Sequence, residues 1–104
     1  MATIDPEVLL PNERLRELAE DGELVQIHRG DQYAEEGDTF EIDGETFEVT
    51  AVEHRTLGDL TDEDARAEGS EDLAAYRERM ERVHRDRFEW DDEAEVVRHR
   101  FEAV

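Results

Sequence analysis

Residues 39–54 most constrain the fold of this chain, because they have the pattern of a β-hairpin. Asp43-Gly44 stands at the centre, and apolar side chains alternate with polar ones on either side. Such a pair between alternating runs favours a two-residue turn in which both residues have positive φ. The side chains expected to face inward are Phe40, Ile42, Phe47, Val49 and Val52. The three-residue step from Val49 to Val52 interrupts the alternation, which predicts a β-bulge.

A helix and a strand are predicted before the hairpin. Asn12 is a good N-cap, and Gly22 is placed to end the helix in the left-handed conformation. In residues 23–29 the apolar Val25 and Ile27 alternate with the polar Gln26 and His28. This pattern predicts a strand with one buried and one exposed face.

Two helices and a final strand are predicted after the hairpin. Residues 61–67 begin with the form of a capping box, and Gly69 ends this helix. Ser70 is the expected N-cap of a longer helix that runs to His84. Residues 95–104 alternate again, with one face formed by Val97, His99 and Phe101. Strands that flank a helical insert predict an α+β domain, a small, mostly antiparallel β-barrel with flanking helices whose terminal strand closes the sheet.

The charge of the chain constrains the solvent in which such a domain folds. Asp and Glu number 32 against 12 basic side chains, all of them arginine, and the formal net charge is −20. Self-repulsion at this density destabilises a compact state in dilute buffer, whereas at 1 M salt the Debye length falls to roughly 3 Å. The absence of lysine also removes apolar stems from the surface. We therefore expect a cytoplasmic protein of a halophilic, archaeal-type organism.

An acidic, partly disordered tail is the alternative for this composition. Leu, Ile, Val and Phe number 23 of 104 residues, just above the level of about 20% below which highly charged chains usually stay unfolded. Because these residues are patterned and not scattered, we expect a folded monomer with a single domain over residues 1–104.

Several kinds of site find no support in the residues. Cysteine is absent, which excludes disulfides and thiolate metal sites. The four histidines are far apart in sequence, and the acidic runs lack the glycine and spacing of a calcium loop. The chain has one serine, no glycine-rich phosphate loop and no long apolar stretch. We expect no metal, no cofactor and no membrane segment.

Several short motifs occur in an order that resembles the ASCH family. They are Gly22-Glu23-Leu24-Val25-Gln26-Ile27-His28-Arg29, then Glu36-Gly37-Asp38 with the hairpin, then Thr56-Leu57-Gly58-Asp59-Leu60-Thr61, Asp64-Ala65 and Glu68-Gly69. The resemblance spans residues 9–102 and implies a PUA-like β-barrel, with a cleft between the barrel and the helical insert and a function in RNA binding. Some small ASCH proteins are amidohydrolases of acetylated cytidine that use a Lys, a Thr and a Glu, and a ribonuclease activity has also been proposed in the family.

Carried over residue by residue, the family pattern is incomplete in this chain. Gly22, Arg29 and Glu68 match it. The lysine position falls on Leu24 and the threonine position on Ile27, which have neither an amine nor a hydroxyl. The amidohydrolase mechanism is therefore not expected here, and the missing residues favour binding over catalysis.

Three residues of these motifs are the first candidates for a ligand site in the cleft. Arg29 can hold a phosphate or carboxylate with two hydrogen bonds, or else form a salt bridge, for example with Glu68. Glu68 is a general base if it is desolvated, and otherwise a solvated carboxylate. His28 is expected on the opposite sheet face from Arg29, where a surface histidine is the alternative to a ligand contact.

Aromatic and arginine side chains are further candidates. Tyr33 and Trp90 are candidate base-stacking platforms, with packing in or beside the core as the alternative for Trp90. The dense basic positions are Arg77, Arg79, Arg82, Arg85 and Arg87, together with Arg98 and Arg100. Pairing with glutamates four residues away is one interpretation of the helical arginines, and a basic patch shared with the last strand is the other.

Three functions remain open on these residues. The first is binding of RNA or a nucleotide, for which the candidate residues are Gly22, His28, Arg29, Tyr33, Glu68, Trp90, Arg98 and Arg100. The alternative is a small hydrolase that acts on a modified nucleoside or RNA through Glu68 and Arg29, and a plain ligand- or protein-interaction domain is the third. The acidic charge does not exclude RNA, because counterion release contributes little in molar salt, where hydrogen bonds and stacking provide affinity. We expect binding in multi-molar KCl that Arg29→Ala weakens.

Overall fold

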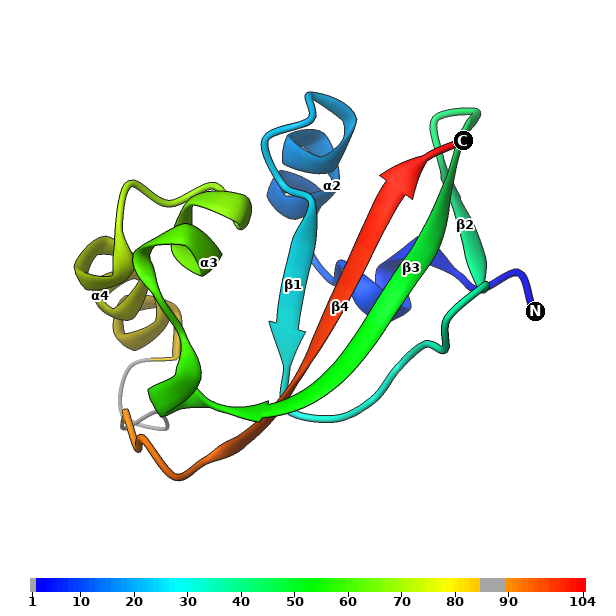
Figure 1. Ribbon diagram of the computed structural model, residues 1–104. Helices are drawn as coiled ribbons and strands as arrows, with labels where there is room; N and C mark the ends of the chain where they lie inside the picture. Colours follow the sequence, from blue (N-terminus) through cyan, green and yellow to red (C-terminus); the bar gives the residue numbers. More distant parts are fainter. Residues whose placement is uncertain (1, 85–89) are drawn as a thin grey trace.

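The computed structural model describes residues 2–84 and 90–104, which form one curled sheet with helices packed around it (Figure 1). In chain order the elements are α1 (Pro6–Leu9), α2 (Glu13–Glu20), β1 (Gln26–Arg29), β2 (Thr39–Ile42), β3 (Glu45–Thr56), the 3-10 turn η1 (Leu57–Asp59), α3 (Asp62–Ala67), α4 (Leu73–His84) and β4 (Glu95–Ala103). The strand order is β1-β4-β3-β2, and neighbouring strands are antiparallel. The predicted α+β class is confirmed. The sheet is a half-barrel in which the terminal strand β4 lies between β1 and β3, so β4 does not close the sheet at an edge as predicted.

The hairpin has the predicted turn and the predicted irregularity. Asp43 and Gly44 have φ values of 49° and 86°, as a turn with two left-handed residues requires. The register pairs Phe40 with Phe47, and it shifts between Val49 and the residue two positions later. The predicted β-bulge is therefore confirmed.

The helix ends agree with the sequence at three places and differ at one. Asn12 accepts the Leu15 N–H, Gly22 has a φ of 78°, and Thr61 opens a capping box as predicted. The prediction of Ser70 as the N-cap of α4 is wrong. The Ser70 N–H belongs to the turn that closes α3, and α4 begins only at Leu73 after the Asp72 side chain, which accepts the Ala75 N–H at 2.8 Å.

The strand β1 is shorter and more buried than predicted. Residues 23–29 were expected to expose every second side chain, but Val25 is 41% exposed while Gln26, Ile27 and His28 are all buried. The alternation is misleading because α3 packs over the face that the polar residues occupy. Ile27 lies in the barrel core and the two polar side chains face α3.

Apolar side chains form two clusters on opposite faces of the sheet. The larger, which we call the barrel core, lies between the sheet and the first two helices, and in it the rings of Phe40, Phe47 and Phe101 have centroids 5.4 to 6.1 Å apart. The smaller, the insert core, consists of Leu57, Leu60, Ala65, Tyr76 and Val96 with their half-buried neighbours. No helix within residues 2–84 and 90–104 combines the length and the apolar character needed to cross a membrane.

Candidate functional site

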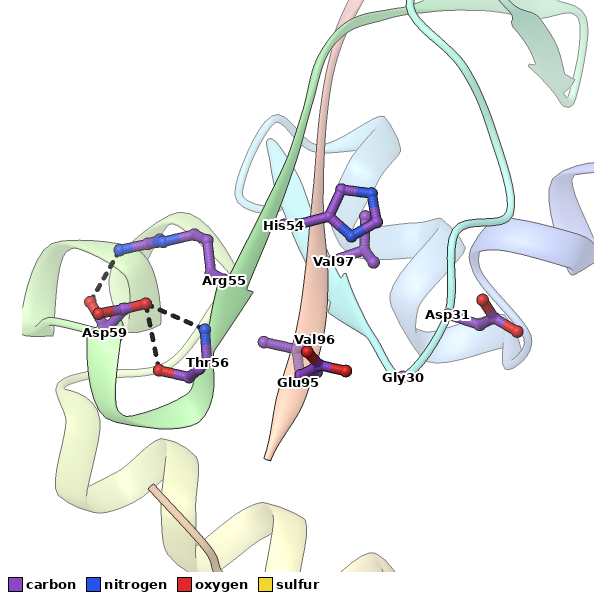
Figure 2. A pocket seen from close by; sticks show the side chains of 9 residues that line it. All are labelled: Gly30, Asp31, His54, Arg55, Thr56, Asp59, Glu95, Val96 and Val97. Carbon is purple, nitrogen blue, oxygen red and sulfur yellow. Dashed lines mark hydrogen bonds between the residues drawn. The ribbon is translucent and has the colours of Figure 1, made fainter. Parts of the chain in front are cut away.

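A hollow of about 390 Å³ opens where β1 and β3 end and β4 begins (Figure 2). Its lining residues are Gly30, Asp31, His54, Arg55, Thr56, Asp59, Glu95, Val96 and Val97. The Thr56 backbone N–H and hydroxyl donate to one Asp59 oxygen at 3.0 and 3.1 Å, which lowers the pKa of that carboxyl. Together with Asp59, the lining includes the carboxylates of Asp31 and Glu95 and the guanidinium of Arg55.

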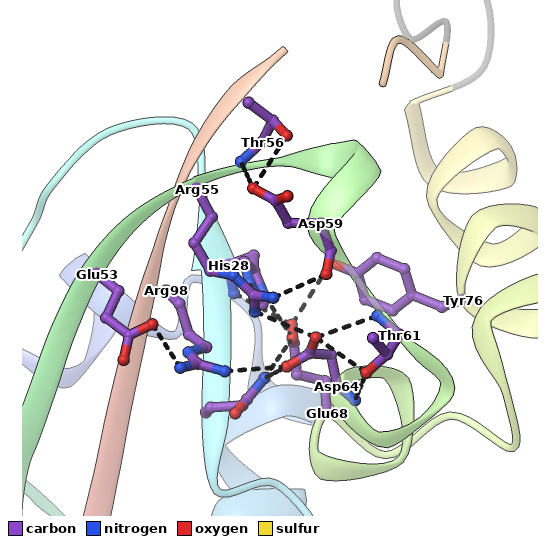
Figure 3. Close-up of polar contacts among 11 residues, drawn as sticks. His28, Glu53, Arg55, Thr56, Asp59, Thr61, Asp64, Glu68, Tyr76 and Arg98 are labelled. Atoms are coloured by element: carbon purple, nitrogen blue, oxygen red, sulfur yellow. Dashed lines mark hydrogen bonds and ion pairs between the residues drawn. The ribbon is translucent and has the colours of Figure 1, made fainter. Parts of the chain in front are cut away.

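A buried polar cluster lies beside this hollow, between the sheet and α3 (Figure 3). We call it the interface cluster, and its members are Gln26, His28, Arg55, Asp64, Glu68 and Arg98. Its amide, imidazole and two carboxylates have no more than 6% of their surface exposed. Groups this buried are stable only when their hydrogen bonds are made. Arg55 also lines the hollow and so connects the two regions.

Glu68 is held in the interface cluster by donors from two elements, β1 and α4. The His28 backbone N–H donates to Oε1 at 3.1 Å, and Gln26 Nε2 donates to Oε2 at 3.3 Å. The Tyr76 hydroxyl donates to Oε1 at 3.4 Å. Burial, with the Glu68 carboxylate beside it, raises the pKa of Tyr76 above its usual value, so this hydroxyl stays a donor. The carboxylate of Glu68 is thus fixed in direction.

The contacts of His28 determine which ring nitrogen carries the proton. Nδ1 lies 2.6 Å from Glu68 Oε2, and Nε2 lies 3.4 Å from Arg55 Nη1. A guanidinium can only donate, so Nε2 is the acceptor. The proton of neutral His28 therefore sits on Nδ1 and is donated to Glu68. Glu68 orients the imidazole, and Arg55 covers its other nitrogen.

Asp64 joins the two arginines to the amide of the cluster. It accepts from Gln26 at 3.0 Å, from Arg98 at 3.2 Å and from Arg55 at 3.1 Å. Burial acts to raise the pKa of Asp64, but hydrogen bonds from Gln26, Thr61 and Arg55 outweigh it and hold the pKa far below its usual range. Asp64 is therefore an anion at neutral pH and binds both guanidinium groups.

Three of the predicted site residues meet in the interface cluster, namely His28, Glu68 and Arg98. The expectations of a surface histidine and of a solvated Glu68 are wrong, because α3 covers this sheet face and leaves the two residues 6% and 2% exposed. Arg100 lies two positions beyond Arg98 on β4 and is exposed. Gly22 follows the C-cap of α2 and provides a left-handed turn.

Arg29 lies on the other face of the sheet. Its Nη1 donates to the carbonyls of Val8 and Leu9 at 3.0 and 2.9 Å. The alternative of a salt bridge between Arg29 and Glu68 is therefore wrong, because successive side chains of β1 point to opposite faces. His28, not Arg29, is the partner of Glu68.

The two candidate platforms have different surroundings. Tyr33 is 41% exposed, with the Arg29 guanidinium carbon 4.4 Å from its ring centroid. Trp90 is half-buried and packs against the insert core, where its ring meets Tyr76 edge-on at 6.3 Å. The packing alternative for Trp90 agrees with this position.

The arginines of α4 do not gather into one open patch within the described residues. Arg77 lies over the Trp90 ring, Arg79 donates to the Glu68 carbonyl, and Arg82 pairs with Glu78 four residues before it. Arg85 and Arg87 lie outside the described residues. Arg98 is bound by Glu53 and Asp64. Among the helical arginines that the structure describes, the predicted pairing with a glutamate four residues away is seen for Arg82.

Solved structures with the same arrangement identify the fold. An ASCH domain from Lactobacillus crispatus JV V101 superposes with a TM-score of 0.64 at 18% identity, over 98% of this chain and 78% of that one. The fold is that of an ASCH domain. A DUF984 protein from Enterococcus faecalis V583 superposes at 0.63 with 19% identity, over 99% and 75% of the two chains, and the hypothetical protein PH0355 at 0.55 with 18% identity, over 99% and 98%. Neither a protein-family model nor a curated protein matches the sequence.

Leu24 and Ile27, on which the sequence resemblance places the family's lysine and threonine, lie in the barrel core. They are 1% and 6% exposed. The polar groups that face the insert are instead Gln26 and His28. Both come from β1, one position on either side of Ile27.

Sequence reasoning missed Gln26, Arg55, Asp64 and Tyr76. One signal was present, because Asp64 and Glu68 are four residues apart and share a helix face. Gln26 and His28 likewise share a strand face. No local pattern indicates that this helix face and this strand face pack together, and Arg55 joins them from a third element.

Proposed function

We propose that this ASCH-fold protein binds single-stranded RNA or a nucleotide in the hollow beside Arg55. One observation carries the proposal, namely that Arg55 lies on the border between the hollow and the interface cluster. Its guanidinium is held by Asp64 at 3.1 Å and by the Asp59 carbonyl at 2.7 Å. Arginine planes fixed in this way stack on unpaired bases and donate to their edges.

The other lining groups supply acceptors for a base or a ribose. Carboxylates of Asp31, Asp59 and Glu95 can accept from exocyclic amines and from ribose hydroxyls. A phosphate gains little from the overall charge of −20, but long-range repulsion is screened within roughly 3 Å at 1 M salt. Affinity in such salt depends on short-range hydrogen bonds and stacking, which the hollow offers.

Titration of labelled RNA oligonucleotides in multi-molar KCl tests the proposal. We expect saturable binding that Arg55→Ala weakens about tenfold or more, as loss of a stacked and hydrogen-bonded group predicts. Arg55→Lys keeps the charge but not the plane and is expected to bind weakly. Arg14→Ala, which removes an exposed arginine of α2, is the matched control. Absence of binding by the unmodified protein, or equal affinity of Arg55→Ala, would overturn the proposal.

Hydrolysis of a modified nucleoside or of RNA is a second candidate, favoured by the 2.6 Å contact between His28 and Glu68. A carboxylate that holds Nδ1 of a histidine leaves Nε2 available as a base once its cover moves. Here Arg55 is the cover. Turnover of acetylated cytidine or RNA that is lost in both Glu68→Gln and His28→Gln would support this candidate, and an unmodified protein without turnover would exclude it for those substrates.

We also propose that the protein acts as a monomer in the cytoplasm of a salt-accumulating organism. The net charge of −20 and the complete use of arginine support the habitat. Light scattering in molar KCl that gives twice the mass of one chain would contradict the monomer.

A further inference from the structure

We infer that Tyr33 is a stacking platform for a second base, next to the base held in the hollow. The inference rests on the proposed function and deepens it, because it makes the preferred ligand a strand of at least two nucleotides. It is carried by the way in which the ring is fixed and by its position relative to the hollow.

The Tyr33 ring is backed by a guanidinium that is itself immobilised. Arg29 lies 4.4 Å from the ring centroid, and its Nη1 donates to the carbonyls of Val8 and Leu9. The Tyr33 backbone N–H donates to His99 Nε2 at 3.1 Å, and His99 is fully buried. The residue nevertheless stays 41% exposed. A ring held in this way loses little conformational freedom when a base stacks on it.

The platform is continuous with the hollow along the chain and across the sheet. Gly30 and Asp31 line the hollow, and Tyr33 is two positions after Asp31, so their Cα atoms lie within about 7 Å. His54, which also lines the hollow, contacts the side chain of Gln32 at 3.1 Å (Figure 2 shows His54 and Asp31 on either side of Gly30). A strand that leaves the hollow over this pair meets the exposed Tyr33.

Trp90, the other candidate platform, is already occupied by neighbours. Arg77 lies 4.7 Å from its ring centroid, Tyr76 meets it edge-on, and Nε1 donates to Asp92 at 2.9 Å. Its ring packs with the insert core, so a base would have to displace these contacts. Tyr33 also has a guanidinium against its ring, but it is 41% exposed whereas Trp90 is half-buried.

The test compares a mononucleotide with a short RNA oligonucleotide in multi-molar KCl. We expect Tyr33→Ala to weaken oligonucleotide binding about tenfold, the typical cost of one lost base stack, and to leave mononucleotide binding unchanged. Tyr33→Phe keeps a ring and is expected to bind like the unmodified protein. Arg29→Ala is expected to have a smaller effect in the same direction. Because Tyr33 is exposed, we expect the variants to fold normally, and a thermal melt checks this.

The outcomes separate this inference from the proposed function. If the unmodified protein binds the oligonucleotide and Tyr33→Ala binds it equally well, Tyr33 is not a stacking platform, whereas binding in the hollow is still supported. If Tyr33→Ala weakens the mononucleotide as much as the oligonucleotide, Tyr33 belongs to the hollow and the second base position is wrong. If the unmodified protein binds neither, both proposals fall.

Discussion

The two faces of the sheet are buried by different chemistry. On the barrel side, Phe40, Phe47 and Phe101 pack ring to ring, with the first and second rings stacked at 5.4 Å. On the insert side, Arg98 pairs in register with both His28 and Glu53, and Asp64 lies over the row. The barrel side excludes water with hydrocarbon, whereas the insert side combines a smaller apolar cluster with buried ion pairs.

This difference separates stability from specificity. Apolar burial is non-directional and stabilises at roughly 25 cal/mol per Å² of apolar surface removed from water. A buried ion pair recovers its desolvation cost only when every donor meets an acceptor, so it adds little net stability but fixes geometry. We therefore expect the barrel side to hold the domain together and the insert side to set the positions of Arg55 and His28.

Removal of salt has the largest expected effect. Circular dichroism should show a folded protein in molar KCl and loss of structure in dilute buffer, because the charge of −20 is then poorly screened. At intermediate salt, amide protons of α3 and α4 should exchange before those of β3 and β4, since the insert has the smaller apolar cluster. A chain that stays folded in dilute buffer, or an insert that exchanges last, would contradict the comparison.

Truncation in the barrel core comes next. Phe40→Ala removes a fully buried ring and should lower the free energy of unfolding by about 3–5 kcal/mol, measured by chemical denaturation in molar KCl. Val8→Ala, at a residue that is 41% exposed, is the control and should change it by less than about 0.5 kcal/mol. A small effect of Phe40→Ala would show that the barrel side does not dominate stability.

Removal of Asp64, the central anion of the insert side, should lower the free energy of unfolding by less. Asp64→Ala leaves Arg55 and Arg98 without their shared acceptor and should destabilise by about 2 kcal/mol, the usual scale for hydrogen bonds to charged groups. Asp64→Asn retains one acceptor oxygen and should cost less. RNA affinity should fall in both variants because Arg55 loses its anchor. Unchanged affinity would show that Asp64 does not position Arg55.

The pH dependence of folding stability is the smallest expected effect, and it also distinguishes the two faces. Burial lowers the pKa of His99, on the barrel side, below its ordinary 6.5. Unfolding then takes up a proton, so stability is complete above pH 6.5 and falls below it by at most about 1.4 kcal/mol per pH unit. The pKa of Asp64 is also lowered, here by hydrogen bonds to its charged form, so its contribution to stability is complete above its ordinary 3.8 and is lost only below that value.

Urea unfolding at pH 7 and at pH 5 measures the loss of stability that we expect from His99. His99→Gln cannot titrate and should lose the part of the difference that His99 causes. Equal pH dependence in the variant and the unmodified protein would show that the buried imidazole is not the source.

The hairpin, the helix caps at Asn12 and Thr61 and the last strand could be predicted because their signals are local. A turn pair, a capping side chain and an alternation of two each need only a few neighbouring residues. The site could be predicted only in part. Glu68 and Arg98 were among the candidates, but the partner of Glu68 is His28 and not the adjacent Arg29.

The strands and the turns follow from the sequence alone, since periodicity and backbone preferences are local, and the charge of −20 leads us to expect folding in high salt. The tertiary structure alone decided that α3 lies over the polar face of β1, because packing between distant segments depends on shape across the whole domain. That contact turned Gln26 and His28 from exposed residues into buried ones. It also brought Arg55 to the edge of the hollow, where we expect the ligand.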